Sequence, residues 1–139
     1  MTRGLSQLDV LLGEWITTSK TYPEGRGRTT VTLAEGGKFV RIEASIDDER
    51  FPQSAQLIGA DEAQDECISL YYDSRGVYRV YLTTIEAGVW TMWRDAPGFN
   101  QRYTGKISDD GRAIAGRWEF SEDGKQWKVD FDLNYEKVV

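Results

Sequence analysis

The sequence predicts an all-β fold, a closed up-and-down antiparallel barrel of about ten strands with a short N-terminal helix. Turn-forming segments rich in Asp and Gly recur at intervals of roughly 10 to 14 residues, which is typical of short strands joined by hairpins. The segments between them alternate apolar and polar residues, as strands do when one face meets a core. Because every connection is short and open sheet edges invite aggregation, closure into a barrel is favoured over a two-sheet sandwich.

The first expected element is the helix, over Ser6–Leu12. Leucines stand at positions 5, 8, 11 and 12, a spacing that places them on one helical face. Ser6 is a suitable N-cap and Gly13 a suitable terminator, so about two turns are expected.

The strands that follow are expected to turn their apolar sets toward the core. Three such sets are Val40, Ile42, Ala44 and Ile46; Tyr78, Val80 and Leu82; and Ile114 and Trp118. The opposing sets, expected to face water, include Arg41, Arg79 and Arg117. In the last strand one apolar face is expected to hold Trp127, Val129, Phe131, Leu133 and Tyr135. These patterns predict a charged outer surface without an apolar patch.

Composition limits the possible functions. A chain of 139 residues is the size of one domain, here 1–139. It has 17 Lys and Arg against 23 Asp and Glu, a net charge of −6 that disfavours nucleic-acid binding. The absence of His removes the commonest general base and metal ligand, and the single Cys67 cannot form an internal disulfide. We therefore expect no metal and no cofactor.

The sequence also bears on location. No export signal or lipidation motif is recognisable, and no apolar run approaches the roughly 18 residues that span a bilayer. We expect a cytoplasmic protein that makes no membrane contact.

Several segments carry a family resemblance. They are Leu11-Leu12-Gly13-Glu14-Trp15, Gly36-Gly37-Lys38-Phe39, Tyr71-Tyr72-Asp73-Ser74-Arg75-Gly76 and Phe131-Asp132-Leu133-Asn134-Tyr135. Together they resemble the calycin superfamily, which includes lipocalins, fatty-acid-binding proteins and nitrobindins, and within it an uncharacterised bacterial family of single domains. The resemblance implies that Trp15 closes one barrel end and that Gly13 lets the chain pass tightly beneath it.

Two departures limit what the resemblance implies about activity. Nitrobindins hold haem through a proximal His, and this chain has none, so haem binding is not expected. Fatty-acid-binding proteins carry, two residues before a tyrosine of the last strand, an arginine that clamps the lipid carboxylate. Leu133 stands at that position before Tyr135, so that clamp is missing.

The densest aromatic segment is the candidate ligand site. A strand projects Trp90, Met92 and Arg94 to one side, and such a face suits a flat apolar ligand with an anionic or polar end. Further candidate walls of the lumen are Tyr72, Tyr78, Tyr103 and Trp118.

Three functions follow from these features. The first is a non-enzymatic barrel that binds a small apolar or amphipathic molecule in its lumen. The second is a barrel enzyme of the cyclase or isomerase type, acting by shape with a Tyr or carboxylate acid. The third is a filled barrel that serves as an interaction module. Its partner would meet the loops around Phe51-Pro52 and Ala96-Pro97-Gly98-Phe99, and a homodimer is one possibility.

Overall fold

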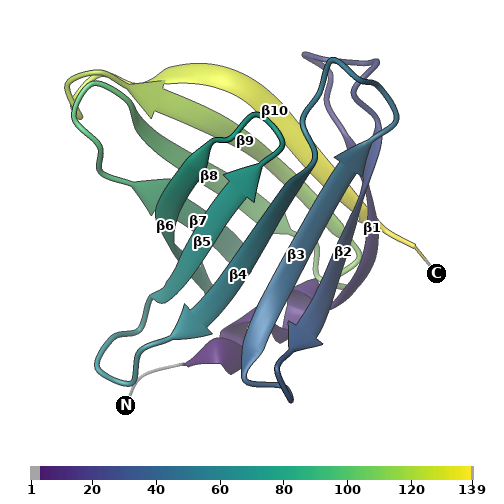
Figure 1. Cartoon of the computed structure of the whole chain (residues 1–139), viewed down its shortest axis with the longest axis vertical. Helices are drawn as coiled ribbons and strands as arrows, with labels where there is room; N and C mark the ends of the chain where they lie inside the picture. The colour runs from purple at the N-terminus through teal and green to yellow at the C-terminus, as the bar shows by residue number, and fades with distance from the viewer. Residues whose placement is uncertain (1–3, 139) are drawn as a thin grey trace.

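The computed structural model describes residues 4–138, which form a single closed barrel (Figure 1). A 3-10 helix, η1 (Leu5–Leu11), precedes ten strands. The strands are β1 (Gly13–Thr18), β2 (Gly27–Ala34), β3 (Phe39–Ile46), β4 (Ser54–Ala60), β5 (Cys67–Asp73), β6 (Tyr78–Glu86), β7 (Val89–Arg94), β8 (Asn100–Ile107), β9 (Ala113–Ser121) and β10 (Lys128–Lys137).

Each strand pairs antiparallel with the next, and the first pairs with the last. The β1–β10 ladder runs from Trp15 opposite Lys137 to Thr18 opposite Asn134, and this ladder closes the sheet. The predicted fold class, an up-and-down barrel with a short N-terminal helix, is therefore confirmed.

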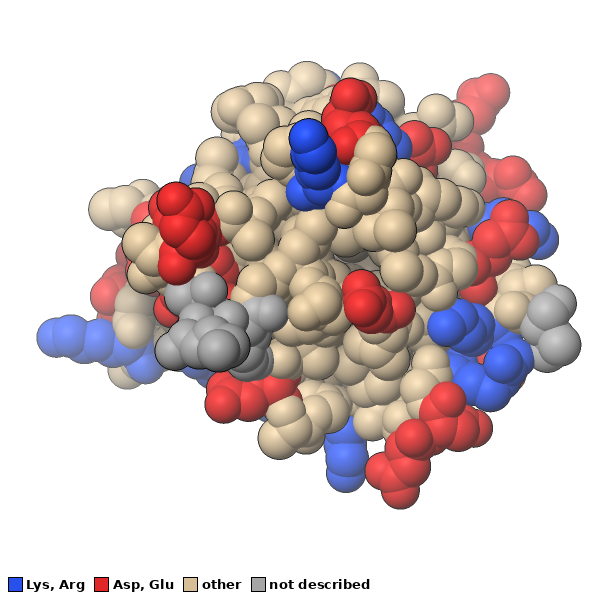
Figure 2. Space-filling view, turned by 90° about the horizontal axis from the view of Figure 1, so that it is seen from below, with Lys and Arg blue, Asp and Glu red and all other residues tan. Residues whose placement is uncertain are grey.

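The helix covers one end of the barrel, at the bottom of Figure 1. Its own Leu8 and Leu11 are fully buried in the hydrophobic core. Seen from this end, the centre of the surface is mostly uncharged, and charged side chains lie mainly toward its periphery (Figure 2). The predicted N-cap is wrong: the helix begins at Leu5, Gly4 holds the cap position, and no side chain caps it.

The chain turns from η1 into β1 at Gly13, whose φ of 129° favours glycine. A Cβ on Gly13 would also lie 3.0 Å from Cε of Lys137. Trp15 then enters the barrel and donates a hydrogen bond from Nε1 to the carbonyl of Leu11 at 2.8 Å. Gly13 and Trp15 thus join the helix to the barrel wall at its covered end.

Most predicted strand faces match the structure, and β6 is the main correction. Val40, Ile42 and Ile114 are buried as expected. On β6, however, Tyr81 and Thr83 are buried and Tyr78 and Val80 are exposed, the reverse of the prediction. The polar groups of the inward residues have partners in the lumen, which removes the cost of burying them. The Tyr81 hydroxyl donates to Gln101 Oε1 at 2.9 Å, and Thr83 Oγ1 accepts from Trp90 Nε1 at 2.9 Å.

The last strand does not keep one apolar face. Its pairing with β9 shifts register between Val129 and Phe131, so Val129 lies opposite Glu119 and Phe131 lies opposite Trp118. Val129 is therefore exposed on the outer face. The guanidinium of Arg102 lies 4.0 Å from the ring centroid of Trp127. Only Phe131, Leu133 and Tyr135 keep the predicted inward direction.

Candidate ligand site in the barrel lumen

The half of the lumen next to η1 is filled by aromatic rings. The ring of Trp90 lies 5.3 Å from that of Tyr103 and 5.6 Å from that of Tyr135, centroid to centroid. Trp15 packs edge-on against Tyr135 at 6.3 Å. The void among these rings and the neighbouring aliphatic side chains has a volume of about 10 Å³. That volume holds about one water molecule.

The tyrosines of this half are poor acids. Burial raises the pKa values of Tyr103 and Tyr135 far above the usual range for a phenol. The Tyr103 hydroxyl is also engaged, because it donates to the carbonyl of Leu133 at 2.9 Å.

The other half of the lumen, which we call the open half because its inward Arg79, Arg94 and Trp118 are partly exposed, holds positive charge. Tyr81 and Gln101 in the same half are buried. Arg94 lies directly across from Gln101 in the β7–β8 ladder, and Arg79 Nη1 donates to Gln101 Oε1 at 3.2 Å. Tyr81 donates to the same oxygen, so both hydrogen bonds that this amide oxygen accepts come from β6.

Both guanidinium groups act on Tyr81. Burial raises the pKa of this phenol, and Arg79 and Arg94 oppose the rise. The Arg79 guanidinium also lies 5.3 Å from the ring centroid of Phe99. Within residues 4–138, neither Arg79 nor Arg94 forms a salt bridge, whereas Arg28, Arg50, Arg75, Arg102 and Arg117 each pair with a carboxylate.

Asp73 is the inward carboxylate nearest to Arg79 in the β5–β6 register, and it already has partners. Asp73 accepts a hydrogen bond from the Tyr71 hydroxyl at 2.7 Å and pairs with Arg75 at 2.6 Å. Arg75, and to a lesser degree Tyr71, hold the pKa of Asp73 well below its usual range. The negative charge of Asp73 is therefore compensated by Arg75.

Rings connect the two halves of the lumen. Trp118 lies 5.4 Å from Tyr103 in the filled half and 5.6 Å from Tyr81 in the open half, between ring centroids. Tyr71 continues the contact at 6.0 Å from Tyr81. A ligand that entered the open half would meet arginines on one side and aromatic rings at its floor.

The predicted lumen walls divide into three groups. The structure places Trp90, Met92 and Tyr103 inward in the filled half, and Arg94 and Trp118 inward in the open half. Tyr72 and Tyr78 are wrong as lumen walls, because they pair with each other on the outer face and are exposed. Their place in an outward-facing apolar row explains the error.

Sequence reasoning missed Arg79, Tyr81 and Gln101. Arg79 was expected to face water, and this prediction is wrong because β6 has the opposite facing. Arg41 and Arg117 do face outward as predicted. The missed signal was that Tyr81 and Thr83 can satisfy their polar groups inside a barrel, which allows the Arg79 face to turn inward.

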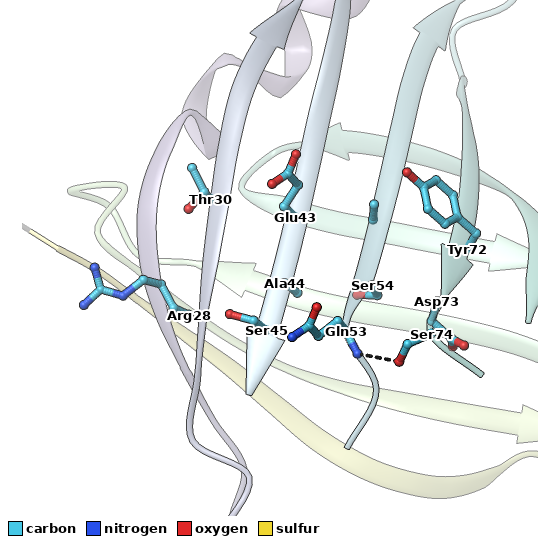
Figure 3. Close-up of a pocket in the computed structure, with 11 residues that line it drawn as sticks. Arg28, Thr30, Glu43, Ala44, Ser45, Gln53, Ser54, Tyr72, Asp73 and Ser74 are labelled. Atoms are coloured by element: carbon cyan, nitrogen blue, oxygen red, sulfur yellow. Dashed lines mark hydrogen bonds between the residues drawn. The ribbon is translucent and has the colours of Figure 1, made fainter. Parts of the chain in front are cut away.

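A second concavity lies outside the lumen, on the outer face of β2–β5 (Figure 3). It is an open depression of about 450 Å³. Its polar lining includes Arg28, Thr30, Glu43, Gln53 and Ser74, with Tyr72 at one side. Arg28 is already paired with Glu14 at 3.6 Å, and the amide of Gln53 donates to Ser74 Oγ at 3.0 Å. This lining carries less uncompensated charge than the lumenal arginines.

Comparison with protein-family models gives no match, and no curated protein matches the chain. The closed ten-stranded barrel is compatible with a calycin-like fold. In residues 4–138, no helix has the length and apolar character needed to cross a membrane.

Proposed function

We propose that the protein binds a small amphipathic anion in the open half of its lumen. The observation that carries this proposal is the pair Arg79 and Arg94, which point inward without a carboxylate partner among the described residues of a chain with net charge −6. Partly buried cations that share one side of a lumen repel each other and lose hydration. A bound anion offsets both costs.

The recognising chemistry is that of the guanidinium group. Its planar fork of donors matches a carboxylate, sulfonate or phosphate, and such charge-assisted hydrogen bonds are among the strong ones in proteins. The apolar part of the ligand would lie on Trp118 and the partly exposed Phe131 and Leu133. This arrangement matches the amphipathic ligand expected from sequence, with Arg79 added to Arg94.

The proposal includes membership of the calycin-like bacterial family and a cytoplasmic location. Its support is the barrel with one covered end together with the segments that resemble that family. Lumenal binding fits such barrels because barrels of this kind hold small ligands in their interior.

The barrel-enzyme alternative has less support. A general acid needs a pKa near the working pH, which for a carboxyl group means a raised value. Asp73, the inward carboxylate, has its pKa lowered instead, and the buried phenols have theirs raised out of reach.

The test is a fluorescence titration with matched probes. We expect 8-anilinonaphthalene-1-sulfonate, an aromatic anion, to bind saturably, and its uncharged analogue N-phenyl-1-naphthylamine to bind at least about tenfold more weakly. Arg79→Gln and Arg94→Gln should each weaken sulfonate binding by about tenfold. Arg117→Gln, on the outer face and paired with Glu119, is the control and should change little.

Three results would contradict the proposal. One is the absence of saturable binding by the sulfonate. The second is equal affinity of the two probes. The third is sulfonate binding that Arg79→Gln and Arg117→Gln alter to the same extent, which would place the probe elsewhere on the surface.

A further inference from the structure

The outer face of β4, β5 and β6 carries an unbroken apolar surface, which we call the β4–β6 face. In register it consists of three rows across the three strands. The rows are Ala55, Tyr72 and Tyr78; Leu57, Leu70 and Val80; and Gly59, Ile68 and Leu82. No charged side chain interrupts them. The prediction of a charged outer surface without an apolar patch is therefore wrong for this third of the barrel.

Much of this face is open to solvent. Tyr78 is 65% exposed, Val80 51%, Tyr72 46% and Ile68 38%. Phe39 extends the face from β3, where it lies over Gly59 and is 38% exposed. Taking about 200 Å² for a fully exposed large side chain, these five leave roughly 500 Å² of surface. The half-buried Leu57, Leu70 and Leu82 fill the spaces between them.

The rest of the outer wall is different in character. Outward positions on other strands hold Arg28 and Glu14, Arg102 and Glu119, and Arg117, all of them in ion pairs. An apolar area of this size is at the upper end for a monomeric domain, and patches of this kind are often functional.

We propose that the β4–β6 face packs against the same face of a second copy of this chain. The apolar area approaches the roughly 800 Å² per partner of a standard interface once a polar rim is added. Interfaces between identical chains are also the more apolar class and resemble a domain core cut in half. The strands pair around a closed barrel, so face-to-face sheet packing is the mode of association that this outer wall offers.

The rim suits a self-complementary contact. Next to the face on β3, Arg41 lies 4.0 Å from Glu43, so this border holds both signs of charge. The aromatic residues of the two loops expected to meet a partner, Phe51 and Phe99, also have ring partners within the chain. Phe51 packs on Tyr22 at 5.9 Å and Phe99 on Phe120 at 6.0 Å, between ring centroids. The proposal concerns only the outer wall, so it stands or falls separately from anion binding in the lumen.

The test is sedimentation equilibrium of the full chain from about 1 to 100 μM. We expect a concentration-dependent mass that approaches twice 15.8 kDa. Val80→Arg places a charge in the middle row of the face and should weaken dimerisation by at least about tenfold. Val129→Arg is the matched control, because Val129 is 58% exposed on the outer face of β10. It should leave the dimer unchanged within about twofold.

A second variant, Tyr78→Ser, guards against misfolding of the first. Near-ultraviolet circular dichroism of each variant should match the wild type, and Tyr78→Ser should also weaken the dimer. The proposal is overturned if the wild type is monomeric throughout the concentration range. It is equally overturned if Val80→Arg and Val129→Arg affect the dimer alike, or if well-folded Val80→Arg remains as dimeric as the wild type.

Discussion

Tyr103 crosses the lumen because two glycines leave room for its ring. Gly105 and Gly116 lie opposite each other on β8 and β9. A Cβ on Gly105 would lie 2.8 Å from Cε2 of Tyr103, and one on Gly116 would overlap the Tyr103 hydroxyl. The ring therefore passes over the glycine pair and reaches the carbonyl of Leu133 on β10. Here small residues are needed for space, and their φ angles are ordinary.

Gly116→Ala should therefore lower the free energy of unfolding by about 1–3 kcal/mol, the usual cost of overpacking. Urea denaturation measures it. In a Tyr103→Phe background the hydroxyl is gone, so the cost of Gly116→Ala should be smaller than in the wild type. Equal costs in the two backgrounds would show that the strain does not involve this hydroxyl.

At the scale of elements, Asp132 fastens the connection between β1 and β2 to β10. Its carboxylate accepts hydrogen bonds from the amides of Lys20 and Thr21 at 2.8 and 2.9 Å, and from the hydroxyls of Ser19 and Thr21 at 2.9 and 2.8 Å. These donors hold the pKa of Asp132 well below its usual range. A carboxylate in the outward set of β10 thus has a structural task that alternation alone does not reveal.

Asp132→Asn should lower the free energy of unfolding at pH 7 by about 1 kcal/mol, since the amide keeps only one acceptor. The folded pKa lies below the unfolded one. The contribution is therefore present above pH of about 4 and is lost as the pH falls further. The difference between wild type and variant should narrow from pH 5 to pH 2 in urea titrations.

Asp130→Asn is the control for this prediction, because Asp130 is exposed on the same strand and lies outside these hydrogen bonds. It should change stability little at any pH. A gap between wild type and Asp132→Asn that stays constant down to pH 2 would mean that the charge of Asp132 does not contribute.

The strands and their closure were predictable because both depend on local signals, turn chemistry and two-residue alternation. The prediction of which strand face points inward was wrong in two places, and each error has a physical reason. On β6 the apolar residues Tyr78 and Val80 form part of an outer surface. The rule that the apolar face of a strand points to the core therefore gives the wrong direction there. On β10 the register shift after Val129 uses one extra residue, and alternation has no means of locating it.

The candidate site could likewise be predicted from the sequence only in part. The parity of β7, which carries Trp90, Met92 and Arg94, was left open by the sequence, and the structure turns these three residues inward. Arg79 and Gln101 could not be found from their own strands, because their meeting depends on pairing between β6, β7 and β8.

At the scale of the whole molecule, the barrel is divided along its axis. One half is covered by η1 and filled by rings, and the other is open and carries Arg79 and Arg94. An anion held at the arginines would point its apolar part toward Trp118. Beyond Trp118 the rings of Tyr103 and Trp90 leave room for only about one water molecule. The open half therefore sets a limit on ligand length.

This division predicts how affinity depends on the length of a straight-chain carboxylate. Each added methylene should tighten binding by about fourfold while apolar surface of the open half is still uncovered. Affinity should then reach a plateau, because a longer chain must displace packed rings or stay in water. Displacement of the bound naphthalene sulfonate by carboxylates of four to fourteen carbons measures the series.

Met92→Ala shortens a buried side chain of the filled half and should move the plateau to longer chains. Thr91→Ala, outward on the same strand, should leave it in place. Affinity that rises steadily to fourteen carbons in the wild type, or a plateau that Met92→Ala does not move, would mean that the filled half does not set the limit.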